Sequence, residues 1–183
     1  MRKSILALTF LATAQFALAA DFSLESPDIK PDGRIKLEQV FDGFGCTGNN
    51  ISPGLSWRDP PRDTKSFALL VHDPDAPTGG SGWWHWVVIN IPATTNALPA
   101  GAGKADGSAM VAGATQVTTD FSSVGWGGPC PPVGDKAHHY IFTVHALKTE
   151  KLDIPAGATA ALVGYMVNAN SIGKATFTGL FGR

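Results

Sequence analysis

The chain has 183 residues, of which 44% are hydrophobic and 16% are charged, and its 14 basic and 15 acidic residues give a formal net charge of −1. So few basic residues argue against a nucleic-acid-binding protein, because such proteins neutralise phosphates with clusters of Lys and Arg. Glycine (21) and proline (13) are abundant, which is unusual for a helical protein and typical of short strands joined by tight turns.

The first 19 residues have the pattern of a secretory signal peptide. A basic start, residues 1–3, precedes an apolar stretch, residues 4–18, that ends in Ala-Leu-Ala at positions 17–19. The stretch is too short to span a membrane as a helix, and no later segment predicts a membrane span. We expect cleavage after Ala19, which removes two basic and no acidic residues and leaves a net charge of −3. Residues 20–183 then form a single exported domain, periplasmic or secreted.

Most of that domain is predicted to be short strands, because apolar and β-branched residues alternate or cluster between turn signals. The predicted strands cover residues 22–26, 33–38, 55–57, 67–72, 86–91, 138–147 and 175–180. Only residues 155–172 indicate a helix, since apolar side chains recur there at helical spacing. Long runs of strands with one late helix predict an all-β-dominated antiparallel sandwich.

The side chains with chemistry lie between the two central strands. Residues 73–77 (Asp-Pro-Asp-Ala-Pro) place two carboxylates after the first strand, where prolines forbid a helix or a sheet ladder. A glycine-rich tip then leads into residues 83–86 (Trp-Trp-His-Trp). Strict alternation along the second strand predicts that His85 shares a face with Val87 and Ile89. The sequence thus predicts an acid pair and a histidine at neighbouring strand ends.

Cys46 and Cys130 are the only cysteines of the chain. Because an exported protein meets oxidising conditions, we expect these two residues to form a disulfide rather than two free thiols. The bond would close a loop of about 85 residues and stabilise the fold by roughly 4 kcal/mol on the chain-entropy model.

Four motifs occur in a fixed order: residues 48–57 (GNNISPGLSW), residues 73–77 (DPDAP) followed by 84–90 (WHWVVIN), residues 128–132 (GPCPP) and residues 138–140 (HHY). In this order they resemble the phosphatidylethanolamine-binding protein family, which includes Raf kinase inhibitor protein. The glycine-rich loop before His85, the GPCPP motif and the leader are similar to the bacterial, Raf kinase inhibitor-like branch.

The resemblance implies a Greek-key antiparallel β-sandwich with a C-terminal helix and short peripheral helices. It also implies a small surface pocket for phosphate-type anions, and a cis peptide bond before Pro77. The pocket residues that it implies are Asp73, Asp75, His85, Pro131, Pro132, His138 and Tyr140. Asp75 has a second interpretation, as a turn residue that accepts backbone hydrogen bonds.

The residues themselves support an anion pocket. His85 and His138 can each donate to a phosphate oxygen, and Tyr140 supplies a hydroxyl. Glycine-rich turns expose backbone amides to an anion. A nearby carboxylate repels an anion unless Asp73 accepts the second N–H of a histidine, which predicts binding that weakens as pH rises through the histidine's range. In the alternative arrangement, the bound phosphate is monoprotonated and donates to the acid.

Three function classes follow from these patterns. The first is an exported, non-enzymatic protein without a cofactor, which binds a phospholipid headgroup, a phosphometabolite or a phosphorylated protein and acts as a kinase-inhibitor-like modulator of signalling. The second is a hydrolase that uses Asp73, His85 and His138, although the chain lacks a Gly-x-Ser-x-Gly elbow and an obviously activated nucleophile. In the third, the same side chains ligate zinc or another divalent ion, although their spacing matches no compact metal motif. Resemblance to the bacterial branch also implies a homodimer.

Overall fold

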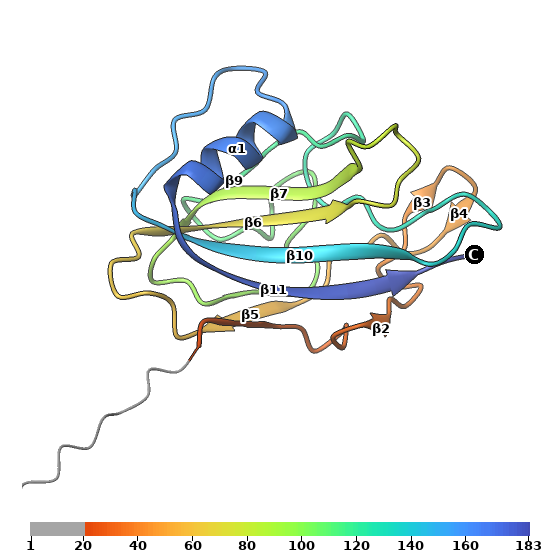
Figure 1. The fold of residues 1–183 in the computed structure, drawn as a ribbon, viewed down its shortest axis with the longest axis horizontal. Coiled ribbons are helices and arrows are strands. Elements are labelled where there is room, and N and C mark those ends of the chain that lie inside the picture. The colour runs from red at the N-terminus through yellow and green to blue at the C-terminus, as the bar shows by residue number, and fades with distance from the viewer. Residues whose placement is uncertain (1–20) are drawn as a thin grey trace, which may run out of the picture.

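The computed structural model of the protein describes residues 21–183 (Figure 1), so the signal peptide expected at residues 1–19 lies outside the described residues. The described elements are β1 (Ser23–Glu25), β2 (Gly33–Arg34), β3 (Asp42–Gly43), β4 (Cys46–Thr47), β5 (Leu55–Arg58), β6 (Ser66–Asp73), β7 (Trp83–Pro92), β8 (Ala97–Leu98), β9 (Thr115–Gln116), β10 (His138–Leu147), α1 (Ala160–Asn170) and β11 (Ser171–Phe181).

The strands form one large sheet and two small ones. The large sheet has the order β2-β11-β10-β6-β7-β9, a second sheet has the order β1-β5-β8, and β3 pairs with β4. All pairs are antiparallel except β2 with β11, which makes the large sheet mixed. The predicted β-dominated fold with one C-terminal helix is therefore confirmed, with one parallel pair at the sheet edge.

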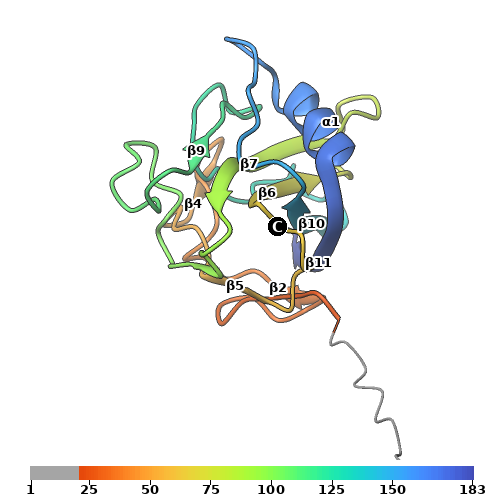
Figure 2. The same ribbon diagram turned by 90° about the vertical axis from the view of Figure 1, so that its left-hand side faces the viewer.

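The core lies on both faces of the large sheet. One face packs Tyr140, Phe142 and Val144 of β10 against residues of the smaller sheet such as Trp57. The opposite face is covered by α1, as Figure 2 shows in a view turned toward the strand ends. The alternation predicted for residues 138–147 is confirmed in the first part of β10. Every second side chain there is buried, and Tyr140, Phe142 and Val144 pack in the sandwich core.

The helix is shorter than the predicted 155–172. Thr159 caps its N-terminus, because the Thr159 hydroxyl accepts a hydrogen bond from the N–H of Leu162 at 3.2 Å. At the other end, β11 starts directly after Asn170. A β-carbon at Gly164 would lie 3.2 Å from the ring of Trp84, so this glycine lets α1 approach β7 closely.

The expected short peripheral helices are absent from residues 21–183, where α1 is the single helix. The connecting segments form turns instead, because they are rich in glycine and proline, which favour turns and interrupt helices. Within the same residues, no helix has the length and apolar character needed to cross a membrane.

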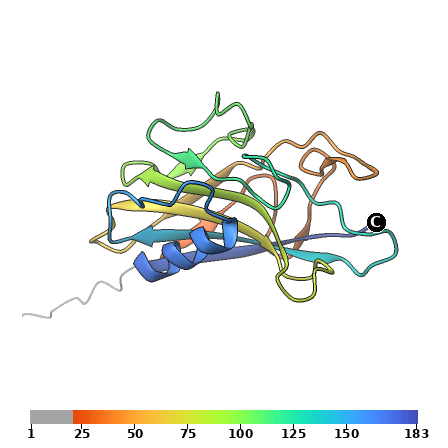
Figure 3. The same ribbon diagram turned by 90° about the horizontal axis from the view of Figure 1, so that it is seen from above.

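One end of the large sheet collects the segments that matter for function. The end of β6, the starts of β7 and β10, the β3–β4 pair and the C-terminus gather there, at the right of Figure 1. Figure 3 shows from above that α1 lies toward the other end of the molecule. We call the first region the pocket end and the surface under α1 the helix-covered face.

Candidate functional site

A pocket of about 240 Å³ lies at the pocket end. Its lining comes from the end of β6 and the loop after it, and from the starts of β7 and β10. The turn between β3 and β4 and the segment between β9 and β10 complete it. The lining residues are Phe44, Asp73, Ala76, Pro77, Thr78, Trp83, His85, Phe121, Cys130, Pro131, Pro132, His138 and Tyr140. The structure thus brings together the residues predicted from the sequence, with the exception of Asp75. That they bind a ligand stays a prediction.

Asp73 and His138 form a buried pair at the base of the site. Oδ2 of Asp73 lies 2.7 Å from Nδ1 of His138, and the two residues are 3% and 4% exposed. Because a carboxylate accepts, Nδ1 of His138 carries the hydrogen and donates it. The other oxygen, Oδ1, accepts from the backbone N–H of Asp75 at 2.8 Å and of Ala76 at 3.2 Å. The turn after β6 therefore holds the acid in place and compensates its burial.

Asp73 thus accepts an N–H of a histidine, as in the first of the two arrangements predicted from the sequence, and the histidine is His138. The second ring nitrogen of His138, Nε2, lies 3.4 Å from Oδ2 of Asp135, a long and weak contact. His138 is thus held between two carboxylates from different segments.

His85 reaches the pocket because of a β-bulge. Val71 pairs with Trp86 and His72 pairs with Trp84, which leaves His85 as an extra residue on β7. A bulge of this kind re-aims the side chain next to it. The ring of His85 therefore packs at 5.0 Å from the ring of Tyr140, on the face opposite to Val87 and Ile89. The prediction from strict alternation was wrong, because it assumed an uninterrupted ladder.

The hydrogen bonding of His85 differs from the expectation that this residue donates to a phosphate. Nδ1 lies 2.5 Å from the carbonyl oxygen of Gly127, and since a carbonyl only accepts, Nδ1 carries the hydrogen. Burial lowers the pKa of His85 to about 4, although the Gly127 carbonyl and Asp73 favour the charged form. At neutral pH the ring is thus neutral, and Nε2 is an acceptor.

Two buried polar atoms of the pocket have no hydrogen-bond partner among the described residues: Nε2 of His85 and the hydroxyl oxygen of Tyr140. Burial first, then the charges of Asp73 and Asp75, and last the approach of the hydroxyl to the Asp73 carboxylate raise the pKa of Tyr140, so the hydroxyl keeps its hydrogen. The carboxylate still makes no hydrogen bond with the hydroxyl. Buried polar atoms are usually satisfied by protein or water. The pocket thus contains one buried acceptor and one buried donor without a partner among residues 21–183.

Aromatic side chains form the apolar wall of the pocket. The ring centroid of Phe121 lies 6.0 Å from the centroid of Phe44, 5.5 Å from that of Trp83 and 5.3 Å from that of His85. Neither Phe44 nor Phe121 was predicted from the sequence to line the pocket. Phe44 lies in the turn between β3 and β4, and Phe121 lies in the segment between β9 and β10. No periodicity or motif in the sequence indicates that these two segments meet.

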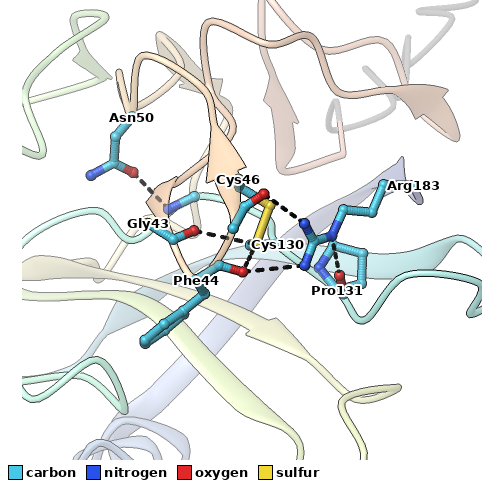
Figure 4. The surroundings of a disulfide bond; sticks show 9 residues. Gly43, Phe44, Cys46, Asn50, Cys130, Pro131 and Arg183 are labelled. Atoms are coloured by element: carbon cyan, nitrogen blue, oxygen red, sulfur yellow. Dashed lines mark hydrogen bonds between the residues drawn. A yellow bond between two sulfur atoms is a disulfide. The ribbon is translucent and has the colours of Figure 1, made fainter.

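The disulfide predicted from the sequence is confirmed. Cys46 and Cys130 are bonded, with their α-carbons 6.0 Å apart. Figure 4 shows the bond between the loop that carries Phe44 and the loop that continues into Pro131. Since Phe44 and Pro131 both line the pocket, the disulfide joins two of its walls.

The last residue, Arg183, supports the same two loops (Figure 4). Its Nε donates to the carbonyl oxygen of Pro131 at 2.7 Å, and its terminal nitrogens donate to those of Gly45 at 2.8 Å and Phe44 at 3.2 Å. Asn50 adds a neighbouring contact, because its side-chain oxygen accepts from the N–H of Gly128 at 2.8 Å. Sequence reasoning gave Arg183 no role.

Asp75 lies outside the pocket lining. Its carboxylate accepts from the backbone N–H and from Nδ1 of His139, both at 2.7 Å. Partial burial acts to raise the pKa of Asp75, but the hydrogen bonds from His139 outweigh it and lower the pKa. Asp75 thus accepts a backbone hydrogen bond, as its second interpretation expects, but from β10 and not from its own turn, so that it ties the loop after β6 to the start of β10. The expected cis bond before Pro77 was wrong, because every peptide bond in residues 21–183 is trans.

No observation on residues 21–183 supports the two other function classes, a metal site or a hydrolase. Residues 21–183 contain no group of three or more His, Cys, Asp or Glu side chains placed to hold a metal ion. The hydroxyl of Thr78 lies 3.1 Å from the carbonyl oxygen of Gly82, to which it donates, and the sulfur of Cys130 is in the disulfide.

Comparison with known proteins agrees with this fold. The family model for phosphatidylethanolamine-binding protein matches residues 25–182. Protein YbcL of Escherichia coli is 52% identical over 180 residues, 98% of each chain, and YbhB of the same organism is 48% identical over 158 residues, 86% of this chain and 98% of the relative. The crystal structure of YbcL, described as a new member of the mammalian PEBP family, has a TM-score of 0.87 and covers 90% of this chain and 99% of its own. The chain belongs to the phosphatidylethanolamine-binding protein family.

Proposed function

We propose that this protein is an exported, non-enzymatic binding protein whose pocket holds a phosphate-type group. The observation that carries the proposal is the pair of partnerless buried atoms, Nε2 of His85 and the hydroxyl of Tyr140, which belong to residues lining one pocket. The hydroxyl can donate to a phosphate oxygen, and the apolar walls strengthen such a bond by excluding water.

The size of the pocket limits the ligand. About 240 Å³ lies below the roughly 300–1,000 Å³ of pockets that enclose drug-sized molecules. This volume supports binding of a single headgroup, a small phosphometabolite or a phosphorylated side chain. A phosphorylated protein is one source of such a group, and a kinase-inhibitor-like role in signalling would act through that ligand.

Export is part of the same proposal. The disulfide between Cys46 and Cys130 is typical of oxidising compartments, in line with the signal-peptide pattern of residues 1–19. Cell fractionation and the intact mass of the native protein test this part. A periplasmic or secreted protein that begins at Ala20 is the expected result, and a cytoplasmic protein with residues 1–19 retained would contradict it.

An NMR titration tests the pocket. Inorganic phosphate, phosphoethanolamine and a phosphoserine peptide are each added to the protein while the histidine ring signals are followed. We expect saturable shifts at His85 and His138. Tyr140→Phe should move both shifts to higher ligand concentration, and the separate variant His85→Ala should do the same for the shift at His138. His145 is a matched internal reference, because it is equally buried but lies outside the pocket. The absence of any saturable shift at millimolar ligand would refute the pocket as an anion site.

A further inference from the structure

The orientation of His85 is fixed by the backbone. The Gly127 carbonyl binds Nδ1–H at 2.5 Å, while Nε2 is buried and has no partner among the described residues. Rotating the ring or moving its hydrogen to Nε2 would leave the buried carbonyl of Gly127 unpaired, which is costly. The ring nitrogen available to a ligand is therefore an acceptor, and the ligand atom beside it must carry a hydrogen.

Burial keeps His85 neutral, although several groups around it favour a positive charge. Asp73 of β6 and Tyr140 and His138 of β10 line the pocket with it, while His72 and Asp120 lie outside the lining and act on it only through their charge. Burial is the largest effect and keeps the ring neutral, with a pKa of about 4, despite the attraction of Asp73 and Asp120. The pocket lining contains neither Lys nor Arg, so no permanent cation offsets a doubly charged ligand.

We infer that the pocket selects the singly protonated form of a phosphate monoester or of inorganic phosphate, whose P–O–H group donates to Nε2 of His85 while another oxygen accepts from the Tyr140 hydroxyl. This inference rests on the proposed function. Sulfate and phosphodiesters have the same tetrahedral shape but carry no such hydrogen near neutral pH, and they would leave Nε2 unpaired.

The negative charge of Asp73 also favours a singly charged ligand over a doubly charged one. Both of its oxygens already accept hydrogen bonds, from His138 on one side and from the backbone of the turn on the other. In a water-poor pocket, repulsion by this carboxylate is stronger for a dianion than for a monoanion. A free or protein-linked monoester is thus a better ligand than the diester of an intact phospholipid headgroup.

The test is the affinity of the full-length mature protein for inorganic phosphate and for sulfate between pH 5 and 8 at constant ionic strength. Leaving a buried acceptor unpaired costs about 1–3 kcal/mol, so sulfate should bind about 10-fold to 100-fold more weakly than phosphate at pH 6. Above the second pKa of the ligand, phosphate affinity should fall about tenfold per pH unit, as the protonated form does. Sulfate affinity should show no such fall, which separates the effect of the ligand's hydrogen from effects of the protein.

Methyl phosphate and dimethyl phosphate separate the two sources of the ligand. We expect methyl phosphate to bind, with a fall in affinity that starts near its own second pKa of about 6, and dimethyl phosphate to bind as weakly as sulfate. Equal affinities for the monoester and the diester would overturn the inference.

His85→Gln provides the discriminating variant, because an amide both donates and accepts. The ratio of phosphate to sulfate affinity should fall toward one, whereas Tyr140→Phe should weaken both anions and leave the ratio unchanged. If phosphate and sulfate bind the unaltered protein equally, the inference fails and the anion pocket stands. If neither binds at any pH, the proposed function itself fails. The measurements on the unaltered protein decide both questions even if a variant does not fold.

Discussion

The pocket end and the helix-covered face each contain a buried histidine, but the hydrogen bonding of the two histidines differs. His85 in the pocket and His145 on β10 are each 3% exposed, and burial lowers the pKa of each to about 4. Nδ1 of His145 lies 3.1 Å from the Ser171 hydroxyl, and His145 pairs with Ala68 of β6, which belongs to the apolar cluster under α1, and lies near Lys174. His85 instead has a buried nitrogen without a partner beside a cavity.

A perturbed histidine pKa therefore does not identify a binding site in this molecule. The distinguishing features are a cavity and polar atoms whose partners are missing from the protein. The helix-covered face should carry stability alone, and the pocket end should carry both stability and binding. The following changes test that division.

Removal of the disulfide should have the largest effect. Cys46→Ser with Cys130→Ser should lower the free energy of unfolding by about 4 kcal/mol, because the bond closes a long loop, and should weaken phosphate binding by separating two pocket walls. Urea denaturation and titration of the same sample measure both effects. The unaltered protein under reducing conditions is the control, and unchanged binding in the double variant would show that the bond serves stability only.

On the helix-covered face, Leu70→Ala should cost stability without affecting binding. Leu70 is 5% exposed and packs in the cluster under α1, so its truncation should lower the free energy of unfolding by about 3 kcal/mol through lost burial and a cavity. Leu162→Ala is the control, because this helix residue is 40% exposed. A loss of phosphate affinity in folded Leu70→Ala would contradict the separation of the two regions.

Acid should destabilise the protein through both histidines. The folded state holds their pKa values at about 4, below the unfolded value of about 6.5. Stability is therefore complete above about pH 6.5 and falls as the pH drops toward 4, by roughly 2 kcal/mol per histidine at pH 5. His145→Gln should remove about half of the difference between pH 7 and pH 5 in urea denaturation, whereas the exposed His139→Gln should leave it unchanged. An unaltered difference in His145→Gln would assign the acid effect to other groups.

The sequence predicted regular elements well and irregular ones poorly. The bounds of β10 and its alternating faces followed from an uninterrupted period of two, and the disulfide followed from the cysteine count and the expected compartment. The face of the sheet on which His85 lies was predicted wrongly, because one bulged residue inverts the alternation. Nothing in the local sequence indicates this bulge. Asp73 and Asp75 are equivalent in the motif, and only the folded backbone separates the buried acid from the turn acid. Phe44, Phe121 and Arg183 were missed because their positions depend on contacts between distant loops.

Arg183→Ala should have the smallest effect and the most local one. Its guanidinium donates three hydrogen bonds to carbonyls of the two disulfide-linked loops, but the residue is exposed, so we expect a loss of about 1 kcal/mol in the free energy of unfolding. Because Phe44 and Pro131 belong to the pocket wall, phosphate affinity should fall severalfold, while the ratio of phosphate to sulfate affinity should stay constant. Arg58→Ala is the matched control, since this arginine pairs with Glu25 on the surface far from the pocket lining and such pairs contribute little. Equal affinities of the two variants would show that the disulfide holds the wall without Arg183, whereas a changed anion ratio would mean that the wall also positions His85.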